Sequence, residues 1–233
     1  MRKFHFCIPL FLSAIIFEAC ATLLFWEKPS YVMVDGTQFI YKGKPYYFVG
    51  ANMWDGCYLG AYGRVDGRVR LINELNELKS EGITNLRVLG ASEYSQAKGS
   101  LTPAIQVDPG VYDEDLLDGM DFLLARMDER SMHAVVFLNN FWEWSGGMAQ
   151  YNYWARADST DTLVGDNSNS FLDYAASFYN NEKAQQLYLN YITYLLTRKN
   201  QYDGYYYYEE PAVMAWELAN EPRPGGDTNY LSA

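Results

Sequence analysis

The stretch AVMAWELANEPR, residues 212–223, decides the fold of this chain. Its apolar run is broken only by Glu217 and leads into the pair Asn220-Glu221, which Pro222 closes. A short apolar run bounded by proline is typical of a buried strand, because proline cannot continue the pairing of a strand. Side chains of a strand alternate between its faces, so Glu217 and Glu221 share one face. The sequence thus predicts a buried strand that presents a carboxylate where it ends.

Strand and helix patterns alternate along the rest of the chain. A hairpin is expected around the turn Asp35-Gly36. Buried strands are expected at 46–51, 83–89, 133–139 and 212–220, and helical spacing of apolar residues covers 69–79, 115–127 and 182–196. Apolar strands that alternate with helices predict a parallel sheet covered by helices.

Two folds have such a sheet, a doubly wound sheet and a (β/α)₈ barrel. The segment VGANMWDG, residues 49–56, lacks the glycine spacing of a dinucleotide-binding loop, which disfavours the doubly wound sheet. Polar and aromatic residues gather at the strand ends instead, namely Asn52, Trp54, Arg87, Asn139, Asn140, Asn220 and Glu221. Barrel enzymes build their active sites at that end of the sheet. We therefore expect a (β/α)₈ barrel.

The spacing of the strands indicates how much of a barrel is present. Strand centres recur about every 56 residues, so four further units would need about 220 more residues. The expectation is the N-terminal half of a barrel over residues 30–233, about four units preceded by the hairpin. A half-barrel has open strand edges, so the chain by itself is expected to be poorly stable and to self-associate. It is also expected to be inactive, because half a barrel lacks the site residues that the other strands would contribute.

Composition limits the classes of partner. The net charge of −11 argues against nucleic acid, whose phosphates select basic surfaces. With 49% hydrophobic and 20% charged residues, the chain can bury a sizeable core. Aromatic residues make up 17% of the chain, which fits either a tyrosine-rich core or a cleft lined with stacking platforms.

Residues 1–21 are expected to be a signal peptide. Arg2 and Lys3 precede a short apolar run, and small residues follow it. Cleavage after Ala21, lipidation of Cys20 and an uncleaved anchor all stay open. The protein is therefore expected to be secreted or lipid-anchored on the cell envelope. Removal of the signal leaves Cys57, with or without a lipidated Cys20, so we expect no disulfide framework and no cysteine-based metal site.

The segment WELANEPR, residues 216–223, strongly resembles the fourth strand of glycoside hydrolase family 5. Three further segments agree with the family: FVGANMW at 48–54, NLRV at 85–88 and FLNNFWEWSGGMAQYNYW at 137–154. The last of these, with its Gly-Gly-x-x-Gln-Tyr loop, resembles the β-mannanase branch. The resemblance runs from about residue 31 to 223. It implies retaining hydrolysis of β-1,4-mannan without metal or cofactor, and a polysaccharide as partner.

The resemblance also implies roles for residues. Glu221 matches the general acid/base, and Asn220 matches the residue that bonds a sugar hydroxyl. Arg87 matches the arginine that steadies the nucleophile, and an interior ion pair with Glu217 is a second interpretation that is compatible with the first. The expected substrate contacts are Trp54, Asn140, Trp142, Trp154 and Arg223, although ordinary packing is the alternative for each tryptophan. The family's nucleophile is a glutamate on the seventh strand, which this chain does not reach.

Two other functions stay open at this point. One is another family 5 β-glycanase such as an endoglucanase. The other is a fragment that holds glycan without cleaving it. An isolated Asn-Glu-Pro would more often be a helix cap or a solvated turn, and only its match to the surrounding segments favours catalysis.

The signal generates a first prediction. Expressed in a bacterial host, the chain should lose about twenty residues, because the basic start and short apolar run direct export. Mass spectrometry of the product checks the new terminus, and fatty-acid label on Cys20 would select the lipoprotein form. Intact Met1 on soluble cytoplasmic protein would contradict it.

Overall fold

A parallel sheet forms the centre of the computed structural model, which describes residues 30–61, 66–156 and 169–224. The predicted signal lies outside these residues. The four strands run β4 (Val49–Asn52), β5 (Ile83–Leu89), β8 (His133–Phe137) and β9 (Val213–Glu217), paired in that order. All three pairings are parallel, with Leu86 opposite Ala134 and Val136 opposite Trp216. The predicted parallel sheet is confirmed.

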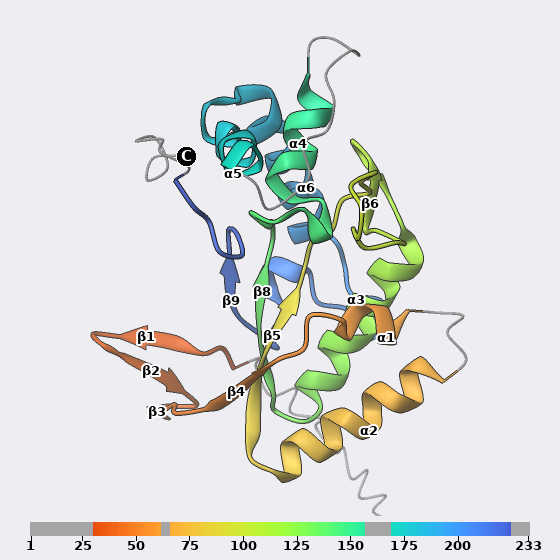
Figure 1. Ribbon diagram of the computed structural model, residues 1–233. Coiled ribbons are helices and arrows are strands. Elements are labelled where there is room, and N and C mark those ends of the chain that lie inside the picture. Colours follow the sequence, from red (N-terminus) through yellow and green to blue (C-terminus); the bar gives the residue numbers. More distant parts are fainter. Residues whose placement is uncertain (1–29, 62–65, 157–168, 225–233) are drawn as a thin grey trace, which may run out of the picture.

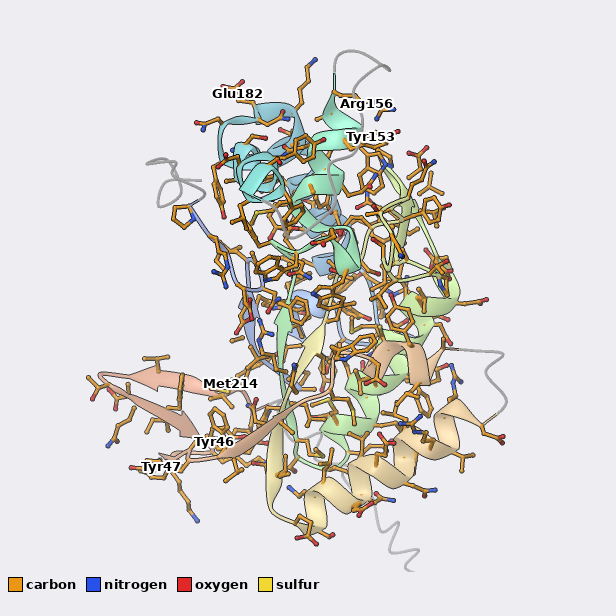
Figure 2. All side chains as sticks on the ribbon, in the orientation of Figure 1. Tyr46, Tyr47, Tyr153, Arg156, Glu182 and Met214 are labelled. Atoms are coloured by element: carbon orange, nitrogen blue, oxygen red, sulfur yellow. The ribbon has the colours of Figure 1, made fainter. Side chains whose placement is uncertain are left out.

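A small antiparallel sheet precedes the parallel one. It consists of β1 (Met33–Asp35), β2 (Gln38–Tyr41) and β3 (Lys44–Pro45), and it projects to the left of the main sheet in Figure 1. Gly36 has φ +59°, a conformation that suits glycine, so the turn lies where the sequence predicts it. Figure 2 shows Tyr46 and Tyr47 where this sheet joins the main one, and Tyr153 and Arg156 at the opposite end of the molecule.

Helices connect the strands and pack against the sheet. Those predicted from spacing are α2 (Gly67–Ser80), α3 (Glu114–Asp128) and α6 (Glu182–Leu196), each within two residues of the expected range. Asp113 caps α3 by accepting hydrogen bonds from the amides of Asp115 and Leu116, which would otherwise lack partners. The buried faces of these helices and strands β5 and β8 form one hydrophobic core.

Several short elements were not predicted from spacing. They are α1 (Gly56–Gly60), the strands β6 (Gln106–Asp108) and β7 (Val111–Tyr112), the 3₁₀ turns η1 (Glu143–Ser145), η2 (Ser177–Asn180) and η3 (Tyr207–Glu209), and the helices α4 (Gly147–Ala155) and α5 (Asn169–Ala176). Helices α4 and α5 lie beyond the carboxyl ends of β8 and β9, at the top of Figure 1. Apart from η3, which leads into the head of β9, these elements follow the carboxyl ends of the strands, where the candidate site lies.

Three strand predictions need correction, one of which is that β9 ends at Glu217, three residues before the end expected at 220. The strand expected to be buried at 46–51 is the partly exposed β4, in which Val49 is 65% exposed. In the described structure β4 pairs only with β5, so its other edge has no neighbour that would cover it. Strand β8 ends at Phe137, two residues before the expected end, because the backbone leaves regular pairing there.

A buried polar network fixes the connection from α6 to β9. The guanidinium of Arg198 donates two hydrogen bonds of 2.9 Å to the Asp121 carboxylate, and the Tyr207 hydroxyl donates to the same group. The Asn200 amide donates to Glu210, whose carboxylate accepts from the amide of Ala212 at the head of β9. The strand that carries Glu217 and Glu221 thus begins at a defined place.

This network generates a prediction about pH. Burial, followed by the nearby Asp203 carboxylate, raises the pKa of Glu210 from its ordinary value of 4.5 to about 8. Between these values the folded protein holds a proton that the unfolded chain releases. Stability should therefore fall as pH rises from about 4.5 to about 8, by at most ~1.4 kcal/mol of unfolding free energy per pH unit.

Glu210→Gln removes the titrating group, so its melting temperature should fall less between pH 5 and pH 8 than that of the wild type. Glu209→Gln, at the exposed neighbouring residue, is the matched control and should follow the wild type. Parallel curves for the wild type and Glu210→Gln would contradict the prediction.

Candidate active site

Strands β8 and β9 continue to pair past their regular ends. The amide of Leu138 donates to the carbonyl of Glu217 at 2.9 Å, and the amide of Asn220 donates to the carbonyl of Asn139 at 2.8 Å. The side-chain amide of Asn220 then donates to the side-chain oxygen of Asn140 at 2.9 Å. Two of the predicted site residues, Asn140 and Asn220, are therefore in direct contact across the strand ends.

Glu221 projects from this paired segment into solvent. Its carboxylate accepts a hydrogen bond of 2.7 Å from the indole nitrogen of Trp142, and the Arg223 guanidinium lies 3.7 Å from the same oxygen. The Arg223 guanidinium also lies 4.9 Å from the centre of a Trp142 ring, a cation–π distance. Three predicted residues thus form one cluster, and 58% of the Glu221 side chain is exposed to an approaching ligand.

The backbone of Glu221 is unusual. Its φ is +46°, in the left-handed region that a non-glycine residue seldom adopts. Such conformations persist only where the surroundings enforce them, and they concentrate at functional sites. The amide of Phe141 donates to the carbonyl of Asn220 at 3.1 Å, which is one of the contacts that hold the turn.

The loop after β8 has a defined shape. The carbonyl of Asn140 accepts from the amide of Met148 at 2.8 Å, and the side-chain amide of Asn140 donates to the Ser145 hydroxyl at 2.9 Å. Gly147 has φ +63°, and a Cβ added there would lie 2.2 Å from the Asn140 carbonyl oxygen. Only glycine fits at that place, so the Gly-Gly pair of the sequence is explained by a close backbone approach.

Arg87 lies on β5 and faces Glu217 on β9. Its Nε donates to the Glu217 carboxylate at 2.9 Å, and its guanidinium lies 4.5 Å from the centre of the Phe137 ring on the strand between them. The ion pair with Glu217, which is the second interpretation of Arg87 from the sequence, is confirmed, although the two side chains are 30% and 37% exposed. The ion pair is compatible with the role toward a nucleophile that the family resemblance implies for Arg87.

The remaining tryptophans lie in other contacts. Trp54, 39% exposed, lies with its ring centre 5.8 Å from that of Trp144 and 6.3 Å from that of Tyr58. Sequence reasoning passed over Trp144, although it stands two residues after Trp142 in the loop. Trp154 packs against the core with its ring 5.6 Å from Tyr151. Among the described contacts, neither Trp54 nor Trp154 touches the Glu221 cluster.

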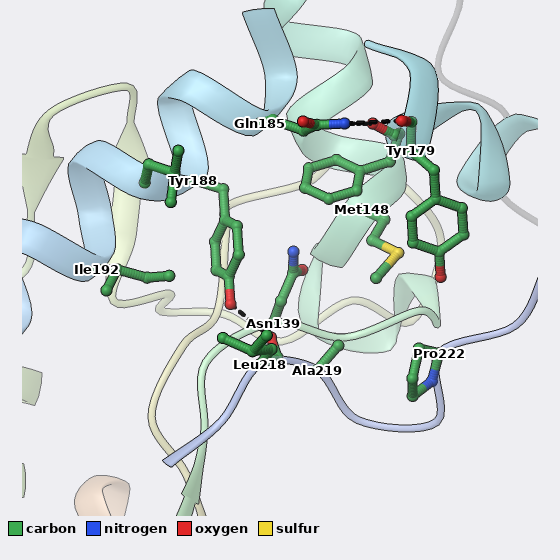
Figure 3. A pocket seen from close by; sticks show the side chains of 11 residues that line it. Asn139, Met148, Tyr179, Gln185, Tyr188, Ile192, Leu218, Ala219 and Pro222 are labelled. Atoms are coloured by element: carbon green, nitrogen blue, oxygen red, sulfur yellow. Dashed lines mark hydrogen bonds between the residues drawn. The ribbon is translucent and has the colours of Figure 1, made fainter. Parts of the chain in front are cut away.

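A cavity of about 370 Å³ lies next to the strand-end segment (Figure 3). Its lining is mostly apolar and comes from α6 and η2 together with Asn139, Met148, Leu218, Ala219 and Pro222. The Tyr188 hydroxyl closes one side by donating to the carbonyl of Leu218. Glu221 and Trp142 are not among its lining residues.

Within 30–61, 66–156 and 169–224, no group of three or more histidine, cysteine, aspartate or glutamate side chains is arranged to hold a metal ion. The helices in those ranges are all too short or too polar to cross a bilayer.

Comparison with known proteins decides the family. A family model described as "GH family 5 beta-mannosidase-like" matches residues 29–231. The chain belongs to glycoside hydrolase family 5. Curated relatives include mannan endo-1,4-beta-mannosidase 1 of Arabidopsis thaliana, which is 30% identical over 86% of this chain and 44% of its own length. A rice (Oryza sativa subsp. japonica) enzyme of the same name is 32% identical over 84% of this chain and 42% of its own length.

Solved structures agree. A family 5 mannosidase from Rhizomucor miehei superposes with a TM-score of 0.75 at 36% identity, covering 83% of this chain and 49% of that one. An endo-1,4-beta-mannanase from the same organism gives 0.64 at 27% identity, with the same coverage. These family 5 structures imply a (β/α)₈ fold, of which this chain covers about half with its parallel sheet. The chain spans about half the length of the relatives that it matches.

Proposed function

We propose that this chain forms part of a glycoside hydrolase that cleaves β-1,4-mannan, with Glu221 as the general acid/base. The observation that carries the proposal is the exposed Glu221 carboxylate at the end of β9, held between Trp142 and Arg223 in a family 5 chain. The relatives named as mannan endo-1,4-beta-mannosidases support mannan as the substrate.

The chemistry assigned to Glu221 follows from the needs of glycoside cleavage. The leaving oxygen must receive a proton as its bond to the sugar breaks, and a positioned carboxylic acid supplies it. The resulting carboxylate then takes a proton from the incoming water. Glu221 suits both steps because its side chain is exposed at the mouth, while Asn220 beside it is held by Asn140 and can bond a sugar hydroxyl.

The neighbouring aromatic and basic groups suit a sugar chain. We propose that Trp142 and Arg223 border the leaving-group side, because both touch Glu221. Trp54, with Trp144, would offer a second platform on the β4 side of the sheet end. The support for a substrate contact is weakest for Trp154, because its ring packs on Tyr151.

Hydrolysis with retention needs a second carboxyl about 5–5.5 Å from the acid/base. Glu217 does not suit this role, because it is paired with Arg87 and lies four residues before Glu221, or ~13 Å along an extended strand. We propose that the nucleophile comes from the part of the relatives' fold that this chain does not span. Arg87 would then steady that carboxylate through Nη1, since its Nε and Nη2 donate to Glu217.

A second candidate is cleavage of single mannose units from chain ends. It is favoured by the higher identity and TM-score to the Rhizomucor miehei mannosidase than to the endo-mannanase of that organism. A variant of that mannosidase was solved with mannosyl-fructose, a short saccharide. Action on mannohexaose separates the two, since an endo-enzyme releases mid-length products early and an exo-enzyme releases mannose throughout.

Two alternative functions use the same site and are distinguished by their products. An endoglucanase would release sugar from cellulose instead of mannan, and a glycan-binding protein would retain mannan without releasing product. Because mannan is a polysaccharide, we propose that the protein works outside the cell, secreted or anchored through Cys20.

The acid role of Glu221 is tested with two leaving groups. In protein that spans the whole barrel, Glu221→Gln should lower kcat on mannohexaose by ~10²–10⁴-fold, because the alkoxide leaving group needs a proton. With 2,4-dinitrophenyl β-mannoside the leaving group departs without protonation, so formation of the glycosyl-enzyme should be nearly unchanged. Steady-state and burst kinetics measure both steps.

Glu143→Gln, in the neighbouring loop, is the matched control and should leave both substrates nearly unaffected. An equal loss on both substrates would argue against general acid catalysis by Glu221. An unchanged rate on mannohexaose would exclude the residue from the reaction.

A further inference from the structure

Glu93 is a buried carboxyl that the proposed chemistry does not use. It follows β5 by four residues, pairs with Gln106 in an isolated bridge, and is only 1% exposed. A buried carboxyl is costly unless it is neutral or well bonded, so its presence calls for a partner.

That partner is the turn that precedes α4. The amide of Gly147 donates to the Glu93 carboxylate at 2.8 Å, and the amide of Glu93 donates to the carbonyl of Ser145 at 2.8 Å. Gly146, with φ +90°, approaches so closely that an added Cβ would lie 2.3 Å from the Glu93 carbonyl oxygen. Glu93 therefore holds the turn from both sides of Gly146.

The same turn leads to the candidate site. The Ser145 hydroxyl accepts from Asn140, whose side-chain oxygen accepts from Asn220. The Asn140 oxygen also accepts from the amide of Trp142 at 3.2 Å, and the Trp142 indole donates to Glu221. A continuous series of hydrogen bonds thus joins the buried carboxyl to the exposed one.

The charge state of Glu93 depends on its surroundings. Burial raises the pKa of its carboxyl to about 7, against the hydrogen bond from the Gly147 amide, which favours the charged form. The other titratable groups that face it are hydroxyls on α6, Tyr188 and Tyr191, and burial raises the pKa of both further above 10. These tyrosines are neutral near pH 7, and the hydroxyl of Tyr151, which faces Glu93 from α4, donates to Gln106. Among the described residues, the donor to the Glu93 carboxylate is the Gly147 amide.

We propose that Glu93 is a positioning residue, which holds the turn 145–147 so that Asn140 and Trp142 meet Asn220 and Glu221. It touches neither Glu221 nor the expected path of a sugar. Because it acts through Glu221, its relevance to catalysis rests on the glycosidase function proposed above. The effect of Glu93 on the geometry of the turn does not depend on that function.

The indole proton of Trp142 reports on this geometry without any substrate. NMR of the 233-residue chain, with the resonance assigned by Trp142→Phe, gives its exchange rate with water. In Glu93→Ala the Gly147 amide loses its acceptor, and the indole proton should exchange at least about tenfold faster, because the loop opens more often. Glu93→Gln keeps an acceptor of the same length, so its rate should stay within about twofold of the wild type.

Asp118→Ala is the matched control, since it removes a half-buried carboxylate that is paired with Arg68, in a contact between α3 and α2 away from the turn and from β9. It should leave the indole exchange rate unchanged. Should Glu93→Ala fail to fold, Glu93→Asp retains the charge but places it one methylene short of Gly147, and it should also speed exchange. Unchanged exchange in a folded Glu93→Ala or Glu93→Asp, or equal acceleration in Asp118→Ala, would overturn the proposal.

Turnover of mannohexaose by protein that spans the whole barrel separates the two inferences. Fast indole exchange together with a lower kcat in Glu93→Ala supports both. Fast exchange in a protein that never cleaves mannosides would reject the proposed function and leave the positioning role intact.

Discussion

The site depends on one constraint, the pairing of β8 with β9 beyond the point where both strands stop being regular. Backbone hydrogen bonds continue through Leu138 and Asn139, and the side chains of Asn140 and Asn220 then bond to each other. Because strands in a parallel pair share direction, their carboxyl ends emerge together, and residues far apart in the chain become neighbours. Trp142 and Glu221 meet for this reason.

The loop after β8 fixes the residues that this pairing brings together. Backbone-to-backbone contacts at Gly146 and Gly147 leave no space for side chains, and a buried carboxyl binds the turn from beneath. Glu221 meanwhile has a backbone conformation that a glutamate adopts only under constraint. The pairing and the loop together hold the exposed Glu221 carboxylate in place. The proposed proton transfer to a bound sugar requires such a fixed position.

Much of this was predictable from local patterns. The bounds of β5 are those expected from its mostly apolar sequence, and the ion pair of Arg87 with Glu217 is one of the two interpretations of Arg87 that the sequence offered. The motif WELANEPR indicated the family as well as the strand, because an apolar strand that ends in Asn-Glu-Pro is specific.

What escaped prediction depends on neighbours in space. The exposure of Val49 reflects an edge without a partner, which periodicity does not reveal. Trp144 and Glu93 carry no local pattern of their own, and their roles arise because loops after different strands converge. Trp154 belongs to the same sequence segment as Trp142, but it lies near the end of α4 and packs against the core.

The most direct test of this account is a double-mutant cycle between Asn140 and Asn220. The free energy of unfolding is measured for Asn140→Ala, Asn220→Ala and the double variant by denaturant titration. If their contact holds the strand ends together, the losses will not add, and the coupling should be about 0.5–3 kcal/mol. Losses that add to within about 0.3 kcal/mol would show that the pairing past the strand ends does not set the position of Glu221.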